Sequence, residues 1–260
     1  MSGNQPLRLN KFLAQAGVCS RRKADELISS GRVAVSGTTV YELGKKIIPG
    51  REAVEVKGIG TVKLKRDRHV YIMLNKPVRV VSTASDPRDR KTVLDFLPQE
   101  IRSRHVYPVG RLDYFSQGLI LLTNDGDLTN RLTHPGFRHK KKYELIVRGR
   151  VSSEALNIMR SGMTLSEGEQ LAPVEINKLP GRGMDTRLEM ILIQGINRQI
   201  RRMCRDLDLT ILKLKRVAHS GLNLGKLAPG KWRHLKNEEI DLLKKGDPSR
   251  SKGGKQTKNS

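Results

Sequence analysis

The sequence predicts an α+β protein with a small unit of helices and strands, a larger domain with a mixed, mainly antiparallel sheet, and a basic tail. Two observations favour this fold class. Residues 7–57 combine two short helical patterns with strands of alternating apolar residues, and from residue 70 onward strand patterns are interleaved with single helices. The expected boundaries are residues 1–66, 67–245 and 246–260. The last segment is rich in Lys, Ser and Gly and lacks aliphatic and aromatic residues, so we expect it to be disordered.

The composition favours a polyanionic partner. Fifty Lys and Arg residues against 26 Asp and Glu give a formal net charge of +24 over 260 residues. Nucleic acid is the leading candidate. An anionic membrane surface fits less well, because no long basic amphipathic helix rich in Trp and Phe is present. Aromatic residues make up only 4% of the chain, so phosphate and shape contacts are favoured over stacking on many bases. No apolar leader or long apolar run is visible, and we expect a cytoplasmic protein.

The first unit should contain two helices and at least two strands. Helical spacing covers residues 9–16, and Ser20 is a good N-cap for a second helix that ends near Gly31. Alternating valines predict strands at residues 33–35 and 54–56. These features predict a compact helix–strand module.

The second helix of this module opens with Arg21, Arg22 and Lys23. Three cations at a helix N-terminus oppose the helix dipole, so an anion bound there would explain them. A solvated basic face is the alternative.

The larger domain begins with an apolar strand pattern that leads into Asn75-Lys76-Pro77. Turn residues, caps and apolar periodicity then divide the remainder into elements. We expect strands over residues 70–74, 78–81, 119–122, 140–147, 171–177, 187–193 and 210–217 and around Trp232, and helices over residues 92–97, 126–134, 152–162, 197–207 and 237–243.

A polar turn, bracketed by Gly110 and Gly118 and called the elbow below, lies before the strand at residues 119–122. Arg111 and Asp113 are two residues apart, so in an extended backbone their side chains point the same way. A carboxylate held beside a guanidinium stays ionised. The elbow therefore predicts a permanent carboxylate where a loop meets a core strand, which is a common position for functional sites. A purely structural ion pair is the alternative.

Two further clusters could meet Asp113. Tyr143 follows three lysines at the start of a strand, and could be a core residue, a surface for base stacking or a hydroxyl near a reacting centre. In the helix at 197–207, for which Asn197 is the expected cap, Arg198, Arg201, Arg202 and Arg205 share one broad face. These like charges repel, so the face needs anions such as RNA phosphates or Asp113. A solvated basic face is again the alternative.

Other chemistries fit poorly. The sequence has no Walker loop, no Gly-rich dinucleotide motif and no Gly-x-Ser-x-Gly elbow. Its six histidines show no pair at i, i+4, and Cys19 and Cys204 are far apart. We therefore expect no metal site.

The first unit resembles the S4-type RNA-binding domain. The motif runs from Leu9-Asn-Lys-Phe-Leu-Ala-Gln-Ala-Gly-Val-Cys-Ser-Arg-Arg-Lys to Gly-Arg-Val-Ala-Val-Ser-Gly37, followed by Leu43-Gly44 and Pro49-Gly50. The resemblance implies that this module binds folded RNA through basic residues such as Arg21, Arg22, Lys23 and Arg32.

The larger domain resembles the RsuA-type ribosomal RNA pseudouridine synthases. This resemblance implies the pseudouridine synthase fold. The elbow Gly110-Arg-Leu-Asp-Tyr-Phe-Ser-Gln-Gly-Leu-Ile-Leu-Leu-Thr-Asn-Asp-Gly126 is similar to the catalytic motif of that family. The motifs Leu74-Asn-Lys-Pro77, Lys141-Lys-Tyr143 and Gly195-Ile-Asn-Arg-Gln-Ile-Arg-Arg-Met203 follow the same pattern in the right order. Tyr114 and Phe115, bulkier than is usual in a variable part of the motif, are expected to influence substrate choice.

This resemblance implies an isomerase that converts a uridine in folded RNA to pseudouridine without a cofactor. It makes Asp113 the catalytic carboxylate, Arg201 its partner and Tyr143 the ring that stacks on the target base. Whether Asp113 attacks C1′ or removes a proton at C2′ stays open. The further residues expected to bind RNA are Arg111, Lys140, Lys141, Arg198 and Arg202.

The expected partner is ribosomal RNA, with 23S RNA of the large subunit favoured over 16S RNA, or a ribosome-assembly intermediate. The target uridine is open, and nothing in the sequence asks for more than a monomer. Two rivals remain at this point. One is a non-catalytic RNA-binding or ribosome-assembly protein, and the other is a glycosidase-like hydrolase, which normally needs two carboxylates.

Overall fold

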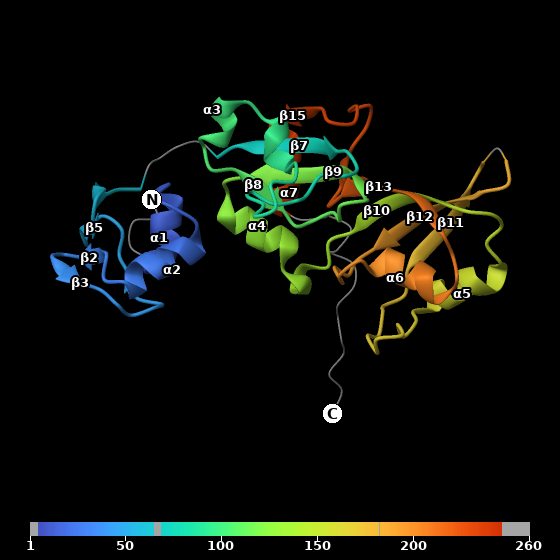
Figure 1. The fold of residues 1–260 in the computed structure, drawn as a ribbon, viewed down its shortest axis with the longest axis horizontal. Helices are drawn as coiled ribbons and strands as arrows, with labels where there is room; N and C mark the ends of the chain where they lie inside the picture. Colours follow the sequence, from blue (N-terminus) through green and yellow to red (C-terminus); the bar gives the residue numbers. More distant parts are fainter. Residues whose placement is uncertain (1–4, 65–68, 182, 246–260) are drawn as a thin grey trace. The chain divides into compact units, whose positions relative to one another are not determined.

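The structure is a computed structural model that describes residues 5–64, 69–181 and 183–245 (Figure 1). The chain divides into two compact units, residues 1–68 and 69–260. The predicted basic tail and the last residues of the basic connector lie outside the described residues.

The first unit contains the predicted helices and strands. Ser20 caps the second helix as expected, because its Oγ accepts a hydrogen bond of 3.2 Å from the Lys23 amide. The helices bury Leu9, Phe12, Leu13, Ala24, Leu27 and Ile28 against the valines of the sheet. The elements are α1 (Leu9–Gln15) and α2 (Arg21–Ser29), a four-stranded sheet in the order β3 (Thr38–Thr39), β2 (Val33–Val35), β5 (Val54–Val56) and β6 (Gly60–Val62), and a separate pair, β1 (Leu7–Arg8) with β4 (Lys46–Ile47).

The second unit is built on one mixed sheet (Figure 1). Every pairing in it is antiparallel except the one between β13 and β9. The main path runs β11 (Glu175–Leu179), β12 (Thr186–Leu192), β10 (Lys141–Val147), β13 (Ile211–His219), β9 (Gln117–Thr123), β7 (Tyr71–Lys76) and β15 (Trp232–His234), with β14 (Leu222–Asn223) paired to β13 and β8 (Tyr107–Val109) paired to β9.

The parallel pairing joins two antiparallel halves of this sheet. It involves only Lys215 with Gln117 and Arg216 with Gly118. Gly118 has φ of +110°, and a Cβ built on it would lie 2.2 Å from the backbone oxygen of Arg216. Only glycine therefore permits this approach of the two backbones. The loop that carries Asp113 ends at the same place.

Helices cover both halves, and the side chains of each strand alternate between the two faces. The helices are α3 (Gln99–Arg102), α4 (Gly126–Thr133), α5 (Ser153–Ser161), α6 (Gln199–Asp206) and α7 (Asn237–Lys245), with short 3-10 helices at Val93–Phe96 and Pro135–Phe137. In the β10–β12 half, α5 and α6 contribute Leu156, Met159, Ile200 and Met203 to one core with Leu145, Leu188 and Met190. In the other half, α4 and α7 cover Met73, Leu119 and Leu121 on one face.

Three expectations about secondary structure were wrong in detail. Residues 78–81 do not form a strand: Arg79 adopts a left-handed φ of +60° in a turn, and only Val81 makes an isolated bridge, to Thr92. The strand expected at 171–177 is displaced to Glu175–Leu179, because Leu171 and Val174 are apolar for core packing rather than for pairing.

The third concerns the start of α6. Asn197 does not cap the helix. Arg198 occupies the N-cap position in a left-handed conformation, with φ of +48° and no side-chain capping bond. The backbone oxygen of Asn197 instead accepts a hydrogen bond of 3.4 Å from Arg202.

Candidate active site

Asp113 lies in the loop between β8 and β9, where hydrogen bonds fix both its backbone and its side chain. Its Oδ1 accepts from the Phe115 amide at 3.0 Å, and its backbone oxygen accepts from the Ser116 amide at 3.1 Å. The preceding Leu112 exchanges two bonds with the Ser82 hydroxyl, at 2.8 and 3.1 Å. The carboxylate is therefore held in a tight turn, with Oδ2 free of these backbone bonds.

Arg201 from α6 supplies the cation for this carboxylate. Its Nε donates to Oδ2 of Asp113 at 3.0 Å, and its Nη2 donates to the Ser116 hydroxyl at 3.2 Å. The two charged side chains are 19% and 25% exposed, so the pair is shielded but still reachable. Arg111, which the spacing had suggested as a partner, is exposed and lines the same pocket.

Lys76, at the end of β7, supports the loop from inside. It is fully buried and its Nζ donates to the backbone oxygens of Ser116 at 2.7 Å and Pro77 at 2.9 Å. Burial lowers the pKa of Lys76 to about 8, Asp113 opposes this shift, and Arg216 and Arg201 add to it. The ammonium thus anchors the turn directly behind the Asp113–Arg201 pair.

This burial predicts a specific pH dependence of stability. The unfolded chain holds the Lys76 proton up to its ordinary pKa of 10.5, whereas the folded protein releases it near 8. The contribution of Lys76 to the free energy of unfolding therefore rises as the pH increases from 8 to 10.5. This gain is lost again as the pH falls back through 8. We expect the free energy of unfolding of the wild type, minus that of Lys76→Met, to increase by about 2 kcal/mol from roughly pH 7.5 to roughly pH 10 in urea titrations. A difference that does not change with pH would contradict the assignment.

A pocket of about 810 Å³ opens at the junction of the two half-sheets. It brings together all three residues expected to be catalytic, since Asp113, Arg201 and Tyr143 line it. Three residues expected to bind RNA also line it: Arg111, Lys141 and Arg198. Lys140 and Arg202 do not line it. The pocket belongs to the second unit, whereas the other residues expected to bind RNA belong to the first: Arg21, Arg22, Lys23 and Arg32.

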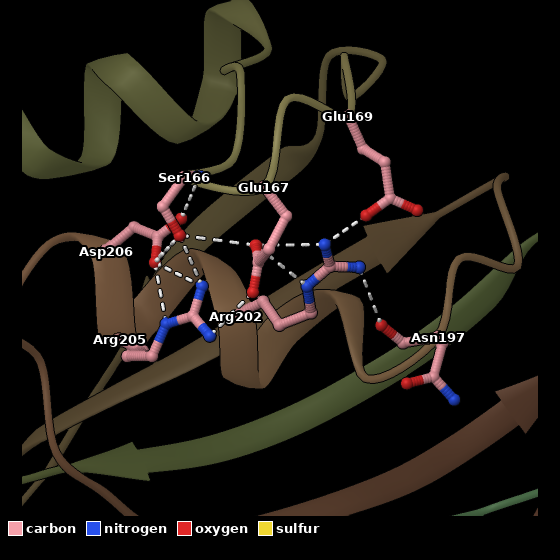
Figure 2. A network of polar contacts seen from close by, with 7 residues as sticks. All are labelled: Ser166, Glu167, Glu169, Asn197, Arg202, Arg205 and Asp206. Carbon is pink, nitrogen blue, oxygen red and sulfur yellow. Dashed lines mark hydrogen bonds and ion pairs between the residues drawn. The ribbon is translucent and has the colours of Figure 1, made fainter.

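The charges on α6 are divided between the pocket and a network on the helix (Figure 2). Arg202 forms ion pairs with Glu167 and Glu169, the first at 2.9 Å. Arg205 pairs with Glu167 at 2.8 Å and with Asp206 at 2.7 Å. The anions needed by this half of the arginine face are therefore the chain's own carboxylates, and the expectation that Arg202 binds RNA stays a prediction.

Three residues of the site were not singled out from the sequence. Lys76 lies within the Asn-Lys-Pro motif. The apolar run at residues 70–74 directly before this motif is the signal that could have pointed to a buried cation. Arg216 and His219 lie in an alternating strand in which their burial, at 2% exposure each, could not be read from the pattern. Among the described residues no group of three or more His, Cys, Asp or Glu could hold a metal ion, and none of their helices is long and apolar enough to cross a membrane.

Comparisons with known proteins identify the family of both units. The family model described as RNA pseudouridylate synthase matches residues 70–206, and the S4 domain model matches residues 7–51. A protein from Aquifex aeolicus described as an uncharacterized RNA pseudouridine synthase is 41% identical, covering 91% of this chain and 93% of its own. The ribosomal large subunit pseudouridine synthase B of Bacillus subtilis is also 41% identical, covering 91% and 95%.

Two further matches extend the comparison. The dual-specificity RNA pseudouridine synthase RluF of Escherichia coli K12 is 36% identical, covering 94% of this chain and 81% of its own. A crystal structure of a pseudouridylate synthase superposes with a TM-score of 0.66 at 26% identity, covering 91% and 99%. The chain belongs to the RNA pseudouridine synthase family. It is an isomerase of that family, with an N-terminal S4 domain.

Proposed function

We propose that the protein isomerises one uridine of 23S ribosomal RNA to pseudouridine, with Asp113 as the catalytic carboxylate. The observation that carries this proposal is the pairing of Asp113 with Arg201 inside a pocket that Tyr143 also lines. The large-subunit target is supported by the 41% identity to the Bacillus subtilis large subunit enzyme.

The reaction needs one carboxylate at the sugar and no redox partner. The C1′–N1 bond of uridine breaks, the uracil rotates, and C1′ bonds to C5. C5 loses a proton and N1 gains one, so the product is an isomer of the substrate. Asp113 would act as the nucleophile at C1′ or as the base at C2′, and either role uses its ionised form. The Arg201 guanidinium holds Oδ2 of this carboxylate by a charge-assisted hydrogen bond of 3.0 Å.

The pocket also suits a nucleotide that has left its helix. Extrusion of a base costs a few kcal/mol of unstacking, which stacking and phosphate contacts offset. Tyr143, half-buried in the pocket wall, is the ring proposed to stack on the uracil. Arg111 and Arg198 are exposed at the same pocket and are the proposed contacts to the RNA backbone. Lys140, directly before β10, is a proposed contact outside the pocket, and its Nζ lies 3.7 Å from Oε1 of Glu175.

The S4 domain is proposed to hold the RNA through the N-terminus of α2. Arg21 and Arg22 are exposed there, the first turn of α2 contains no acidic residue, and Lys23 pairs at 2.6 Å with Glu26. Arg32, exposed just before β2, adds a fourth cation. Phosphates at this end would relieve the repulsion among the cations and with the helix dipole.

Replacing both Arg21 and Arg22 by Gln is expected to weaken binding to a 23S RNA transcript and to make it less salt-dependent. Each lost phosphate contact should reduce the slope of log K against log salt by about 1. Binding isotherms between roughly 50 and 300 mM salt measure this slope. Lys63→Gln, which removes an exposed charge after β6 in the same unit, serves as the control and should alter the slope less. Equal slopes for the wild type and the double variant would refute the proposed contact.

Mapping pseudouridines across ribosomal RNA from cells with and without the gene tests the proposed function. In cells without the gene, we expect one 23S uridine to lack its modification. In vitro, the purified protein should convert the same uridine in an unmodified 23S transcript. A lost 16S site would move the substrate to the small subunit, and unchanged maps in both assays would overturn the proposal. A ribosomal substrate would place the protein in the cytoplasm, acting as a monomer on rRNA or on an assembly intermediate.

A further inference from the structure

One wall of the pocket contains a buried guanidinium that lacks a full set of partners. Arg216 on β13 is 2% exposed, and its Nε donates to the backbone oxygen of Leu119 at 2.7 Å. Its Nη2 is enclosed and has no acceptor among the described residues. A buried donor without an acceptor costs free energy, and more so when the group is charged. The molecule therefore leaves an anion-binding atom beside the pocket.

Two more basic side chains lie near Arg216: Lys141 on the neighbouring strand β10, and His219 farther along β13. Lys141 on β10 lies opposite His219 on β13, as Tyr143 lies opposite Arg216. Among the described residues, the Lys141 ammonium donates to the backbone oxygen of His139, at 3.2 Å, and to no other acceptor. Burial, followed by the charge of Arg216, lowers the pKa of Lys141 to about 8. His219 is 2% exposed, and neither of its ring nitrogens has a partner among the described residues.

The carboxylates that line the pocket are already engaged. Asp113 pairs with Arg201 at 3.0 Å, and Asp86 pairs with Arg90 at 2.7 Å. Lys141 and Arg216 form no ion pair with a carboxylate in the part of the chain that the structure describes. Buried cations of this kind are normally neutralised by a carboxylate or by a ligand. With the pocket carboxylates taken, the counter-charge must come from what enters the pocket.

We propose that Arg216 and Lys141, flanked by His219, form a phosphate subsite that holds a phosphate of the extruded nucleotide. The proposal rests on the proposed function, because the nucleotide that reaches Asp113 carries a phosphate on each side. A guanidinium and an ammonium suit a phosphate, the first as a planar donor and the second as a point charge. A neutral imidazole adds one donor.

The spacing of these residues fits one nucleotide. Lys141 and Tyr143 are two positions apart on β10, which is about 7 Å along a strand, and both line the pocket. The base stacked on Tyr143 and the phosphate held by Lys141 and Arg216 would thus belong to the same nucleotide. The subsite would fix the sugar between them, with C1′ and C2′ directed toward Asp113.

Binding of uridine, uridine 5′-monophosphate and uridine 3′-monophosphate to the full-length protein tests this subsite. Ligand-observed NMR at about 150 mM salt would measure the three affinities. For the wild type we expect at least one monophosphate to bind about tenfold more tightly than uridine. The better isomer identifies which phosphate is held. Equal binding of all three probes would overturn the proposal.

Matched variants locate the effect. Lys141→Met and Arg216→Lys should each reduce the preference for the monophosphate toward unity while uridine binding persists. Lys142→Met removes the same charge one residue away, where the side chain pairs with Glu189 at 3.1 Å and does not line the pocket, and should keep the preference. An equal loss in Lys142→Met would refute the subsite. Asp113→Asn should keep the preference, so a failure of the proposed chemistry is distinguishable from a failure of the subsite.

Discussion

Replacing Asp113 by Asn is expected to abolish pseudouridine formation, to below about 10⁻⁴ of the wild-type rate, while RNA affinity stays within about threefold. The fold should persist, because the Asn oxygen can still accept from the Phe115 amide. The Asn NH2 group then takes the place of Oδ2, so the bond from Arg201 Nε is lost, while Arg201 Nη2 keeps its bond to the Ser116 hydroxyl. The chemistry should fail, because an amide is neither a nucleophile at C1′ nor a base at C2′. Quantifying pseudouridine after reaction with a 23S transcript measures the first effect, and a binding isotherm measures the second.

A matched substitution separates this result from a general effect of charge removal. Asp89 is exposed in the same unit and adopts φ of +51°, a conformation that Asn tolerates well. Asp89→Asn should therefore retain activity. Turnover retained in Asp113→Asn would remove the catalytic assignment, even if every RNA contact were later confirmed.

Replacing Gly118 by Ala is expected to damage both stability and activity. The new Cβ would lie 2.2 Å from the oxygen and 2.7 Å from the nitrogen of Arg216, and both atoms belong to the backbone. The two half-sheets would have to separate at β9 and β13, and the φ of +110° adds strain. We expect a loss of roughly 2–4 kcal/mol in the free energy of unfolding, together with a large loss of activity, because Asp113 and Arg201 come from opposite sides of this junction.

Gly195→Ala provides the control for stability. Gly195 has no positive φ, and a Cβ built there has no neighbour within 4 Å. Chemical denaturation should therefore find it close to the wild type. If Gly118→Ala unfolded at the wild-type denaturant concentration, the close approach of the two backbones would not be a structural requirement.

The sequence predicts much of the fold because local signals and packing agree. Ser20 caps α2, as its position before an apolar helical pattern indicates. The sequence allows either Ser152 or Ser153 as the cap of α5, and the structure shows Ser152. The strand expected at residues 119–122 is buried on both faces, as its unbroken apolar run suggests. Where a turn or a core contact overrides the local pattern, as at residues 78–81 and 171–174, periodicity alone could not place the element.

The candidate site shows the same division. Asp113 and Tyr143 could be selected from turn chemistry and neighbouring cations, and the family resemblance then added their expected roles. The pairing of Asp113 with Arg201 rather than with Arg111 depends on where α6 docks, which no local spacing encodes. Arg202 and Arg205 form ion pairs with Glu167, which lies in a loop that packs against α6 (Figure 2). The arginine face read from the sequence therefore suggested more unpaired charge than the structure presents.

The separation of Asp113 and Arg201 by 88 positions has a consequence for how the protein is made. A ribosome adds roughly 5–20 residues per second, so the carboxylate is synthesised roughly 4–18 s before its cation. The S4 unit is complete earlier still. A nascent chain that stops before α6 would carry an RNA-binding module and an exposed Asp113, yet no assembled site. The proposed active site is therefore complete only when α6 has been synthesised and has docked.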